Sequence, residues 1–350
     1  MNTASVILAA GFGTRMKSSI PKVMHPILGR PLVGWAVDAA TAATGATPVV
    51  VVGYAREQVM EYLGDSARYA EQAEQLGTGH AVRQAASVLQ GQADAVLVTY
   101  GDMPLLQAET LKALVERFTQ AAQEQDAAIA MLTITRADAQ GFGRIIRDGQ
   151  GNVAAIVEEA DCTPEQRRIT ELNPGVYCFD ADWLWTTLPQ IPMSAKGEYY
   201  LTDLVGLAVA QGRRVVSMPA PLDDVYGINT RVHLAEATAT MRRRILERHM
   251  LAGVTILDPA ATWVDAEVEI GADTTLWPGT ILQGRTRIGA ATIGPNTQIV
   301  ASTVGDHTLI KQSVIEHAQV DNHTVRLAHS AICAKAPIWP TACTWATLAK

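Results

Sequence analysis

The chain has 350 residues, 48% of them hydrophobic and 18% charged, with a formal net charge of −7. This composition can bury a sizeable core, and the negative balance excludes a general nucleic-acid binder that works by neutralising phosphates. Residues 49–52 form one of the strongest apolar runs, which is far too short to span a bilayer, and no basic stretch precedes the apolar N-terminal run. We therefore expect a cytoplasmic protein of about two domains that engages neither a membrane nor a nucleic-acid polymer.

A strand and a glycine-rich loop open the chain. Residues 4–10 form a compact apolar run that predicts a buried strand, and residues 11–16 (GFGTRM) follow as a loop of the size that holds a phosphate. A dinucleotide-binding loop would have a third glycine where Met16 stands, whereas the cations of Arg15 and Lys22 suit a triphosphate. Taken alone, the loop is also compatible with a plain tight turn.

Alternating strands and helices follow the loop. Residues 48–53 and 95–100 are apolar runs typical of buried strands, and residues 79–89 and 108–120 have the pattern of helices. This alternation predicts an α/β domain with a largely parallel sheet and helices on both faces. Ligands of such sheets bind beyond the carboxyl ends of the strands, so we expect the glycine-rich loop and Asp102 to face one pocket.

The C-terminal part has a different pattern. Residues 230–251 place apolar side chains at helical spacing and predict a half-exposed helix that connects two domains. Repeats of about six residues follow, which are typical of a solenoid rather than a second α/β domain. Their apolar positions are Ile270, Leu276, Leu282, Ile288, Ile293, Ile299, Val304 and Ile310. We therefore expect a first domain at 1–229, a linker helix at 230–252, a repeat domain at 253–325 and an atypical tail at 326–350.

Several motifs together resemble those of one enzyme family. They are LAAGFGTRM at 8–16, PKV at 21–23, QAEQLGTGH at 72–80, YGD at 100–102, GFGR at 141–144, GEYYLTD at 197–203 and GIN at 227–229. From about Ser5 to about Val325, their order resembles that in the bacterial bifunctional N-acetylglucosamine-1-phosphate uridyltransferase/glucosamine-1-phosphate acetyltransferases. Matches in register are far more specific than any single motif. The resemblance implies a Rossmann-like nucleotidyltransferase domain with a mixed, mostly parallel sheet, then a connecting helix and a short left-handed parallel β-helix.

The resemblance also implies an activity. A UDP-N-acetylglucosamine diphosphorylase transfers UMP from UTP to N-acetylglucosamine 1-phosphate with Mg²⁺ and releases pyrophosphate, a step toward cell-wall precursors. One phosphate anion attacks another in this reaction, so their charges must be screened. Arg15 and Lys22 would do so as the catalytic residues, and Asp102, a hard oxygen ligand, would hold Mg²⁺. The family resemblance adds Asn229 as the second metal ligand.

Substrate-binding positions are carried over from the same resemblance. Those for the nucleotide are Leu8, Ala9, Ala10, Gly11, Gly13, Lys22, Gln72, Gly77 and Thr78, and those for the sugar are Tyr100, Gly101, Gly143, Glu158 and Asn173. Pro174 stands where the family usually has a small polar residue. Proline removes a donor and fixes the local backbone, so sugar affinity and selectivity are the part of the transfer that the resemblance determines least. His25 and His80 are expected to make packing or polar contacts, because displacement at phosphorus needs no protein nucleophile.

The hexapeptide rhythm stops at Arg326. In the resembled family the acetyltransferase site lies on β-helix coils beyond this point, so we expect that activity to be absent. A homotrimer, usual for such β-helices, is disfavoured by the shortened repeat. Residues 330–348, read in the adjacent frame with free choice of synonymous codons, give GHLREGADLADGVHVGNF, which restores the spacing and suggests a frameshift near Val325.

Two alternatives stay open. The same loop chemistry serves nucleotidyltransferases for other sugar 1-phosphates, such as glucose 1-phosphate with UTP or dTTP. A non-catalytic nucleotide-binding assembly protein is the second alternative. The presence of Arg15, Lys22, Asp102 and Asn229 together argues against it.

Overall fold

The computed structural model describes residues 1–139, 141–327 and 331–333. The chain divides into two compact units, Met1–Ala237 and a second that begins at Thr238. This division lies within helix α8 (Arg231–Leu251), in the segment where the sequence predicted a linker helix at 230–252. The first turn of α8 bonds to the first unit: Arg231 Nε donates to the carbonyl oxygen of Met16 at 3.3 Å. Within the described residues, no helix combines the length and apolarity that crossing a bilayer requires.

A ten-stranded mixed sheet organises the first unit, in the order β5-β4-β1-β6-β11-β7-β10-β8-β9 with β12 paired to β7. Its strands are β1 (Thr3–Leu8), β4 (Val49–Val52), β5 (Arg68–Glu71), β6 (Ala95–Tyr100), β7 (Ala127–Thr135), β8 (Gly143–Arg147), β9 (Val153–Val157), β10 (Glu171–Asn173), β11 (Tyr177–Asp180) and β12 (Arg214–Pro219). A separate ribbon pairs β2 (Pro26–Ile27) with β3 (Arg30–Pro31).

The sheet changes direction at β6. Strands β5, β4, β1 and β6 are parallel neighbours. Beyond β6 the neighbours β11, β7, β10, β8 and β9 run antiparallel, and β12 adds one parallel pair with β7. The mixed sheet expected from the sequence is confirmed, but its parallel part is mainly the N-terminal half. The short connection between β8 and β9 explains part of the difference, because a parallel return needs a longer crossover.

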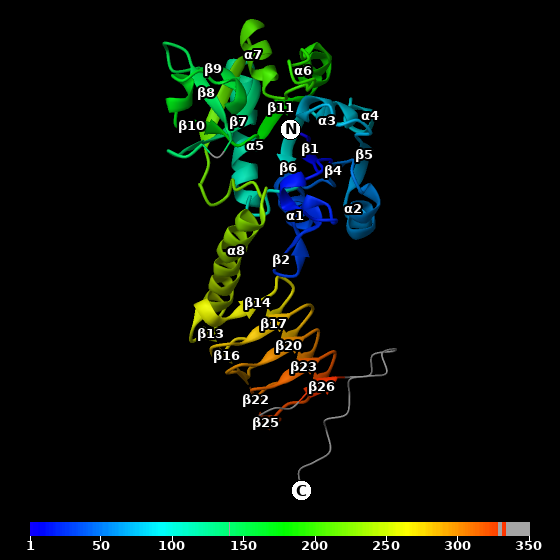
Figure 1. The fold of residues 1–350 in the computed structure, drawn as a ribbon, viewed down its shortest axis with the longest axis vertical. Coiled ribbons are helices and arrows are strands. Elements are labelled where there is room, and N and C mark those ends of the chain that lie inside the picture. The colour runs from blue at the N-terminus through cyan, green and yellow to red at the C-terminus, as the bar shows by residue number, and fades with distance from the viewer. Residues whose placement is uncertain (140, 328–330, 334–350) are drawn as a thin grey trace. The chain divides into compact units, whose positions relative to one another are not determined.

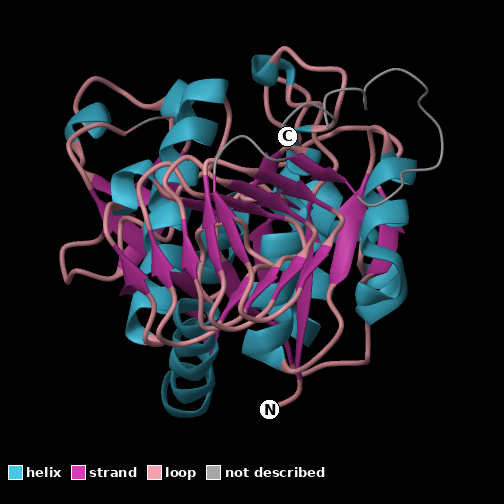
Figure 2. Ribbon diagram, turned by 90° about the horizontal axis from the view of Figure 1, so that it is seen from below, coloured by secondary structure: helices cyan, strands magenta, loops and turns pink. Residues whose placement is uncertain are grey.

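Helices cover both faces of this sheet, as the alternation of strands and helices predicted. They are α1 (Leu32–Thr44), α2 (Arg56–Leu63), α3 (Thr78–Gln84), α4 (Ala86–Leu89), α5 (Ala108–Gln125), α6 (Ala181–Thr187) and α7 (Asp203–Ala210). Successive residues of β1 face opposite cores: Val6 packs in a cluster with Leu204 of α7, and Ile7 packs with Val37 of α1. Figure 2 draws the strands in magenta and the helices in cyan.

The second unit is built from three parallel ladders, with successive rungs β14, β17, β20, β23 and β26 visible in Figure 1. The ladders are β13 (Thr255–Ile256), β16 (Thr275–Leu276), β19 (Thr292–Ile293), β22 (Leu309–Lys311), β25 (Val325–Leu327); β14 (Trp263–Val264), β17 (Ile281–Gln283), β20 (Gln298–Val300), β23 (Val314–Glu316), β26 (Ala331–Cys333); and β15 (Glu269–Ile270), β18 (Arg287–Ile288), β21 (Thr303–Val304), β24 (Gln319–Val320). The predicted apolar positions Leu276, Ile293 and Ile310 align in one ladder and are buried. The short left-handed parallel β-helix expected from the sequence is therefore confirmed as a fold.

The ladders continue beyond the point where the sequence rhythm stops. Arg326 in β25 pairs with Ile310, and Ile332 in β26 pairs with Ile315. The predicted end of the repeat at Val325 is therefore too early, because ladder hydrogen bonds join backbone groups and do not require an apolar side chain at the usual position. The other residues of the predicted tail, 328–330 and 334–350, and most of the segment read in the alternative frame lie outside the described residues.

Candidate active site

A cavity of about 590 Å³ opens in the first unit at the carboxyl ends of β1 and β6. It brings together most of the site residues that the sequence predicted: Leu8, Ala9, Ala10, Gly11, Arg15, Lys22, Gln72, Gly77, Thr78, Tyr100, Asp102, Gly143, Glu158, Asn173 and Asn229. Gly13 and Gly101 are not in its lining. Their roles follow from what a side chain at each position would meet.

The glycine-rich loop turns directly against the segment that carries Lys22. Gly13 has φ +61°, and a Cβ on it would lie 2.5 Å from the Cβ of Lys22. Only glycine accommodates both this backbone conformation and this approach. The short 3-10 helix Thr14–Met16 follows and points Arg15 into the cavity lining. Gly13 thus allows the turns that carry Arg15 and Lys22 to pack closely, so that both cations line the same cavity.

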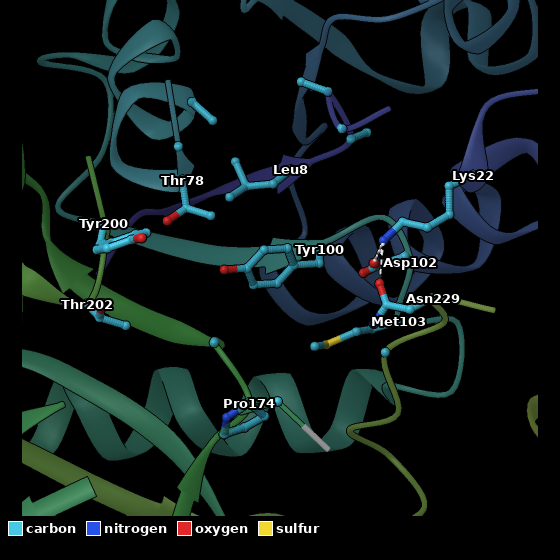
Figure 3. Close-up of a pocket in the computed structure, with 18 of the residues that line it drawn as sticks. Leu8, Lys22, Thr78, Tyr100, Asp102, Met103, Pro174, Tyr200, Thr202 and Asn229 are labelled. Atoms are coloured by element: carbon cyan, nitrogen blue, oxygen red, sulfur yellow. Dashed lines mark hydrogen bonds and ion pairs between the residues drawn. The ribbon is translucent and has the colours of Figure 1, made fainter. Parts of the chain in front are cut away.

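Four side chains form what we call the charged end of the cavity: Arg15, Lys22, Asp102 and Asn229. The Lys22 ammonium forms an ion pair with the Asp102 carboxylate and donates to Asn229 Oδ1 at 3.1 Å. Arg15 Nη2 donates to the same Asn229 oxygen at 2.8 Å. Figure 3 shows Lys22 pointing at Asp102 and Asn229, which come from different segments of the chain. Two positive groups are therefore held side by side around one amide oxygen.

Backbone contacts fix the two oxygen donors of the charged end. Asp102 follows β6, and its carbonyl oxygen accepts from the Ile228 N–H at 3.0 Å. This bond ties the 227–229 segment to the end of β6 and sets Asn229 beside Asp102. A Cβ on Gly101 would lie 3.3 Å from Ala9 Cβ and from Val23 Cγ1, so glycine lets the chain turn tightly here.

The donor set of the charged end fits a hard divalent cation. The Asp102 carboxylate and the Asn229 amide oxygen both contact the Lys22 ammonium, so both oxygens lie around one positively charged group. Within the described residues no group of three or more His, Cys, Asp or Glu side chains could hold a metal by itself. Mg²⁺ commonly binds one or two protein oxygens and completes its shell with phosphates and water. Asp102 and Asn229 match that requirement.

A second part of the cavity lies where α3 begins. Gln72 is buried, and its Nε2 donates to the carbonyl oxygen of Gly77 at 3.0 Å. Gly77 has φ +95°, and a Cβ on it would lie 2.6 Å from the carbonyl oxygen of Tyr199. The Thr78 hydroxyl accepts from the Leu201 N–H at 3.0 Å. These contacts hold the loop before α3 against the 199–201 segment. They position the Gln72 amide and the backbone of Gly77 and Thr78 in the cavity lining.

The opposite part, which we call the polar end, consists of Gly143, Glu158, Asn173 and Thr202. Gly143 begins β8, Glu158 follows β9, and Asn173 ends β10, where it pairs with Gly143. The Thr202 hydroxyl donates to Glu158 Oε1 at 2.8 Å. Burial raises the pKa of Glu158 above its usual range, and the Thr202 hydrogen bond opposes that shift. This end is therefore held by hydrogen bonds between partly or fully buried groups.

Arg144 connects two segments that flank the polar end. It is almost fully buried, and its Nη1 donates to the Phe142 carbonyl oxygen at 2.5 Å and pairs with the Glu159 carboxylate at 2.5 Å. One guanidinium thus joins the loop before Gly143 to the residue after Glu158. Removing Glu159, whose side chain is partly exposed, would leave the buried Arg144 guanidinium without its ionic partner.

Pro174 sits inside a tight turn that the asparagine closes. Asn173 Oδ1 accepts from the Gly175 N–H at 3.0 Å, which is an Asx turn with the proline at its centre. Gly175 has φ +89°, and a Cβ there would lie 2.7 Å from Cε2 of Tyr100. The proline therefore takes a position whose N–H the turn does not use, while its side chain lines the cavity. Figure 3 shows Pro174 and the Tyr100 ring on adjoining parts of the lining.

The structure adds lining residues to which the sequence assigned no role. Glu198, Tyr200 and Thr202 all come from the GEYYLTD motif at 197–203, which was visible in the sequence. Gln75 lies in the QAEQLGTGH motif, and its Nε2 donates to the Ala10 carbonyl oxygen at 2.6 Å. The motifs were a sufficient signal for these positions, but their contacts depend on the fold. His25 and His80 do not line this cavity.

The chain is similar to one family model and to known proteins. The family model described as "MobA-like NTP transferase domain" matches residues 5–249. The chain is 46% identical over 321 residues to the bifunctional protein GlmU of Caldanaerobacter subterraneus subsp. tengcongensis, covering 91% of this chain and 69% of that protein. It is 48% identical over 292 residues to the bifunctional protein GlmU of Geobacter sulfurreducens, covering 82% of this chain and 60% of that protein.

A solved structure of UDP-glucose pyrophosphorylase complexed with UDP-glucose is similar to this chain with a TM-score of 0.56. The two are 19% identical, and the similarity covers 70% of this chain and 100% of that one. At this identity the likeness concerns the fold.

Proposed function

Because the chain belongs to the MobA-like NTP transferase family and to the family of the bifunctional GlmU proteins, we propose that it transfers UMP from UTP to N-acetylglucosamine 1-phosphate with the help of Mg²⁺. The chain is a nucleotidyltransferase of the UDP-N-acetylglucosamine diphosphorylase class. The single observation that carries the proposal is the charged end, where Arg15 and Lys22 converge on the oxygens of Asp102 and Asn229.

The charged end suits a displacement at phosphorus. An oxygen of the sugar phosphate attacks the α-phosphorus of UTP, the bond from that phosphorus to the bridging oxygen breaks, and pyrophosphate leaves with the bond electrons. Two like-charged groups must approach, so cations that already line the cavity reduce the repulsion between them. Arg15 and Lys22 would neutralise the triphosphate. Mg²⁺, when held by Asp102 and Asn229, would supply further charge neutralisation and orient the phosphates.

The loops around the rest of the cavity support the proposed substrates. Gln72 and the Gly77–Thr78 backbone offer amide and carbonyl groups that suit the imide edge of uracil. At the polar end, Glu158 and Asn173 offer an acceptor and an amide to sugar hydroxyls and an acetamido group. Such groups favour a polar sugar over an apolar ligand, because buried polar groups that lose a partner weaken binding.

Three further expectations stay predictions. The absence of acetyltransferase activity depends on tail residues of which most lie outside the described part of the chain. The disfavoured homotrimer is to be tested by light scattering, and the cytoplasmic location by cell fractionation.

The test is pyrophosphate release from UTP with N-acetylglucosamine 1-phosphate and Mg²⁺. Asp102→Ala should abolish the Mg²⁺-dependent turnover, because it removes the charged metal ligand. Glucose 1-phosphate in the same assay checks the sugar, and thiol release from acetyl-coenzyme A with glucosamine 1-phosphate checks the second activity. Turnover only with another sugar 1-phosphate would overturn the proposed acceptor, and nucleotide binding without turnover would favour an assembly protein.

A further inference from the structure

The amide of Asn173 has one orientation that satisfies its surroundings. The backbone N–H of Gly175 lies 3.0 Å from Asn173 Oδ1, and a backbone N–H can only donate. The atom that faces it must therefore be the amide oxygen. If the amide were turned over, two donors would face each other across the turn.

Tyr177 holds the other side of the same amide. Its hydroxyl oxygen lies 2.7 Å from Asn173 Nδ2, and because the Gly175 contact assigns that atom as nitrogen, the tyrosine oxygen is the acceptor. Asn173 Nδ2 carries two hydrogens, so one remains after this bond. Asn173 itself lines the cavity and is 6% exposed. The remaining hydrogen is the one that a ligand can use.

The tyrosine is buried in the sheet and does not line the cavity. Tyr177 begins β11, in the middle of the sheet, where it pairs with Val98 of β6 and Met131 of β7. It is 1% exposed, and its ring lies 5.3 Å from the ring of Phe179. Burial raises the pKa of its phenol well above the ordinary value, so the group stays uncharged at neutral pH. Its oxygen is therefore a stationary neutral acceptor.

We propose that Tyr177 is a positioning residue for sugar selectivity, which orients Asn173 so that its free Nδ2 hydrogen is presented to an acceptor oxygen of the bound sugar. This inference rests on the proposed function, because the ligand of the polar end is taken to be the sugar 1-phosphate. Pro174 and Gly175 close the turn on one side of the amide, and Tyr177 supports the other. The sugar group selected here is an oxygen acceptor such as a hydroxyl or an amide carbonyl.

The experiment compares Tyr177→Phe, Asn173→Ala and the double variant by steady-state kinetics with a panel of sugar 1-phosphates. Tyr177→Phe should raise KM for N-acetylglucosamine 1-phosphate by about threefold to tenfold, the range expected for one lost hydrogen bond, and leave KM for UTP within about twofold. In the Asn173→Ala background the same change should have no further effect on the sugar KM, because the tyrosine acts through the amide.

Two controls separate positioning from folding. Tyr69→Phe removes a hydroxyl that donates to the Gly64 carbonyl oxygen at 2.7 Å, away from the cavity, and should leave both KM values unchanged. Asn173→Asp keeps an acceptor for Gly175 but loses the donor, so it should raise the sugar KM about as much as Asn173→Ala even if Tyr177→Phe does not fold.

Three results would overturn the inference: an unchanged sugar KM in folded Tyr177→Phe, an equal effect of that change with and without Asn173, or an Asn173→Asp variant with wild-type sugar KM. Wild-type protein that uses none of the sugar 1-phosphates would overturn the proposed function as well, whereas an active wild type with unaffected variants would overturn only the role of Tyr177.

Discussion

The charged end and the polar end of the cavity are held by different kinds of contact. At the charged end, Lys22 and Asp102 keep partial access to solvent, with exposed side-chain fractions of 16% and 14%, and ions hold one another. At the polar end, Asn173 is buried and Glu158 is partly buried, and neutral donors hold them: the Thr202 hydroxyl donates to Glu158, and the Gly175 N–H donates to Asn173. This difference predicts that charge matters most for function at the charged end and orientation at the polar end. A change of charge should matter most at the first, and a change of geometry at the second.

The largest effect should come from removing a cation at the charged end. Lys22→Ala should lower kcat/KM by roughly a hundredfold to a thousandfold, the order seen when a group that stabilises developing charge is lost. Lys17→Ala is the matched control, because Lys17 lies in the same loop but is exposed and does not line the cavity, so its kcat/KM should stay within about twofold. A fall of less than about tenfold for Lys22→Ala would mean that charge is not the decisive property of this end.

An intermediate effect is expected from Glu158→Gln, which keeps the shape of the polar end but removes its charge. KM for the sugar 1-phosphate should rise by roughly tenfold, because a hydrogen bond to a charged acceptor is stronger than one to a neutral amide. Kinetics with Glu165→Gln, an exposed carboxylate nearby in sequence, provides the comparison. An unchanged KM would place the sugar elsewhere in the cavity.

The same variant has a stability signature. The pKa of Glu158 is raised above 4.5 in the folded state, so the ionised form is disfavoured by folding, and the native protein loses stability as pH rises through that higher pKa. Glu158→Gln should therefore have a higher Tm than the wild type at pH 7, and the gap should close toward about pH 4, where the wild-type side chain is protonated. Thermal unfolding at the two pH values measures this. A variant that is less stable at pH 7 would show that the Thr202 hydrogen bond outweighs burial.

The smallest effect should come from Pro174→Ser. The Asx turn is closed by the Gly175 N–H and not by the residue before it, so KM for the sugar should change by less than about threefold. Tm should fall slightly, because serine gives the unfolded chain more freedom than proline. Kinetics and thermal unfolding of the same sample give both values. A larger change in KM would show that the donor missing at Pro174 limits sugar binding.

Much of the fold could be read from the sequence, because its signals are local. The valine run of β4 and the apolar run of β6 predicted buried strands, and the six-residue rhythm predicted the second unit. The short antiparallel strands β8, β9 and β10 were not predicted, since three to five residues carry too little pattern to identify a strand. The rhythm also failed to mark β25, where Arg326 takes the place of an aliphatic residue.

The site was predicted unevenly for a related reason. Residues whose chemistry is evident from their type, such as Lys22 and Asp102, were found before the fold was known, and the structure gathers them around one cavity. Their roles in the reaction stay predictions. Thr202 and Tyr177 were missed because each acts through a hydrogen bond to another residue. Thr202 bonds to Glu158, which is far along the chain, and Tyr177 bonds to Asn173 across a turn. A hydroxyl gives no sign in the sequence of which group it will meet.

The ladders of the second unit also bear on the kinds of genetic change that it can absorb. One turn of the ladder runs from Leu276 to Ile293, and the next from Ile293 to Ile310, with a buried aliphatic side chain at the corresponding position each time. Duplicating or deleting one whole turn in frame would leave each rung opposite an equivalent rung. Inserting a single residue within a strand would instead turn the inward side chains outward over the rest of that strand. Copy number of the turns can therefore change during evolution more easily than the length of a strand within a turn.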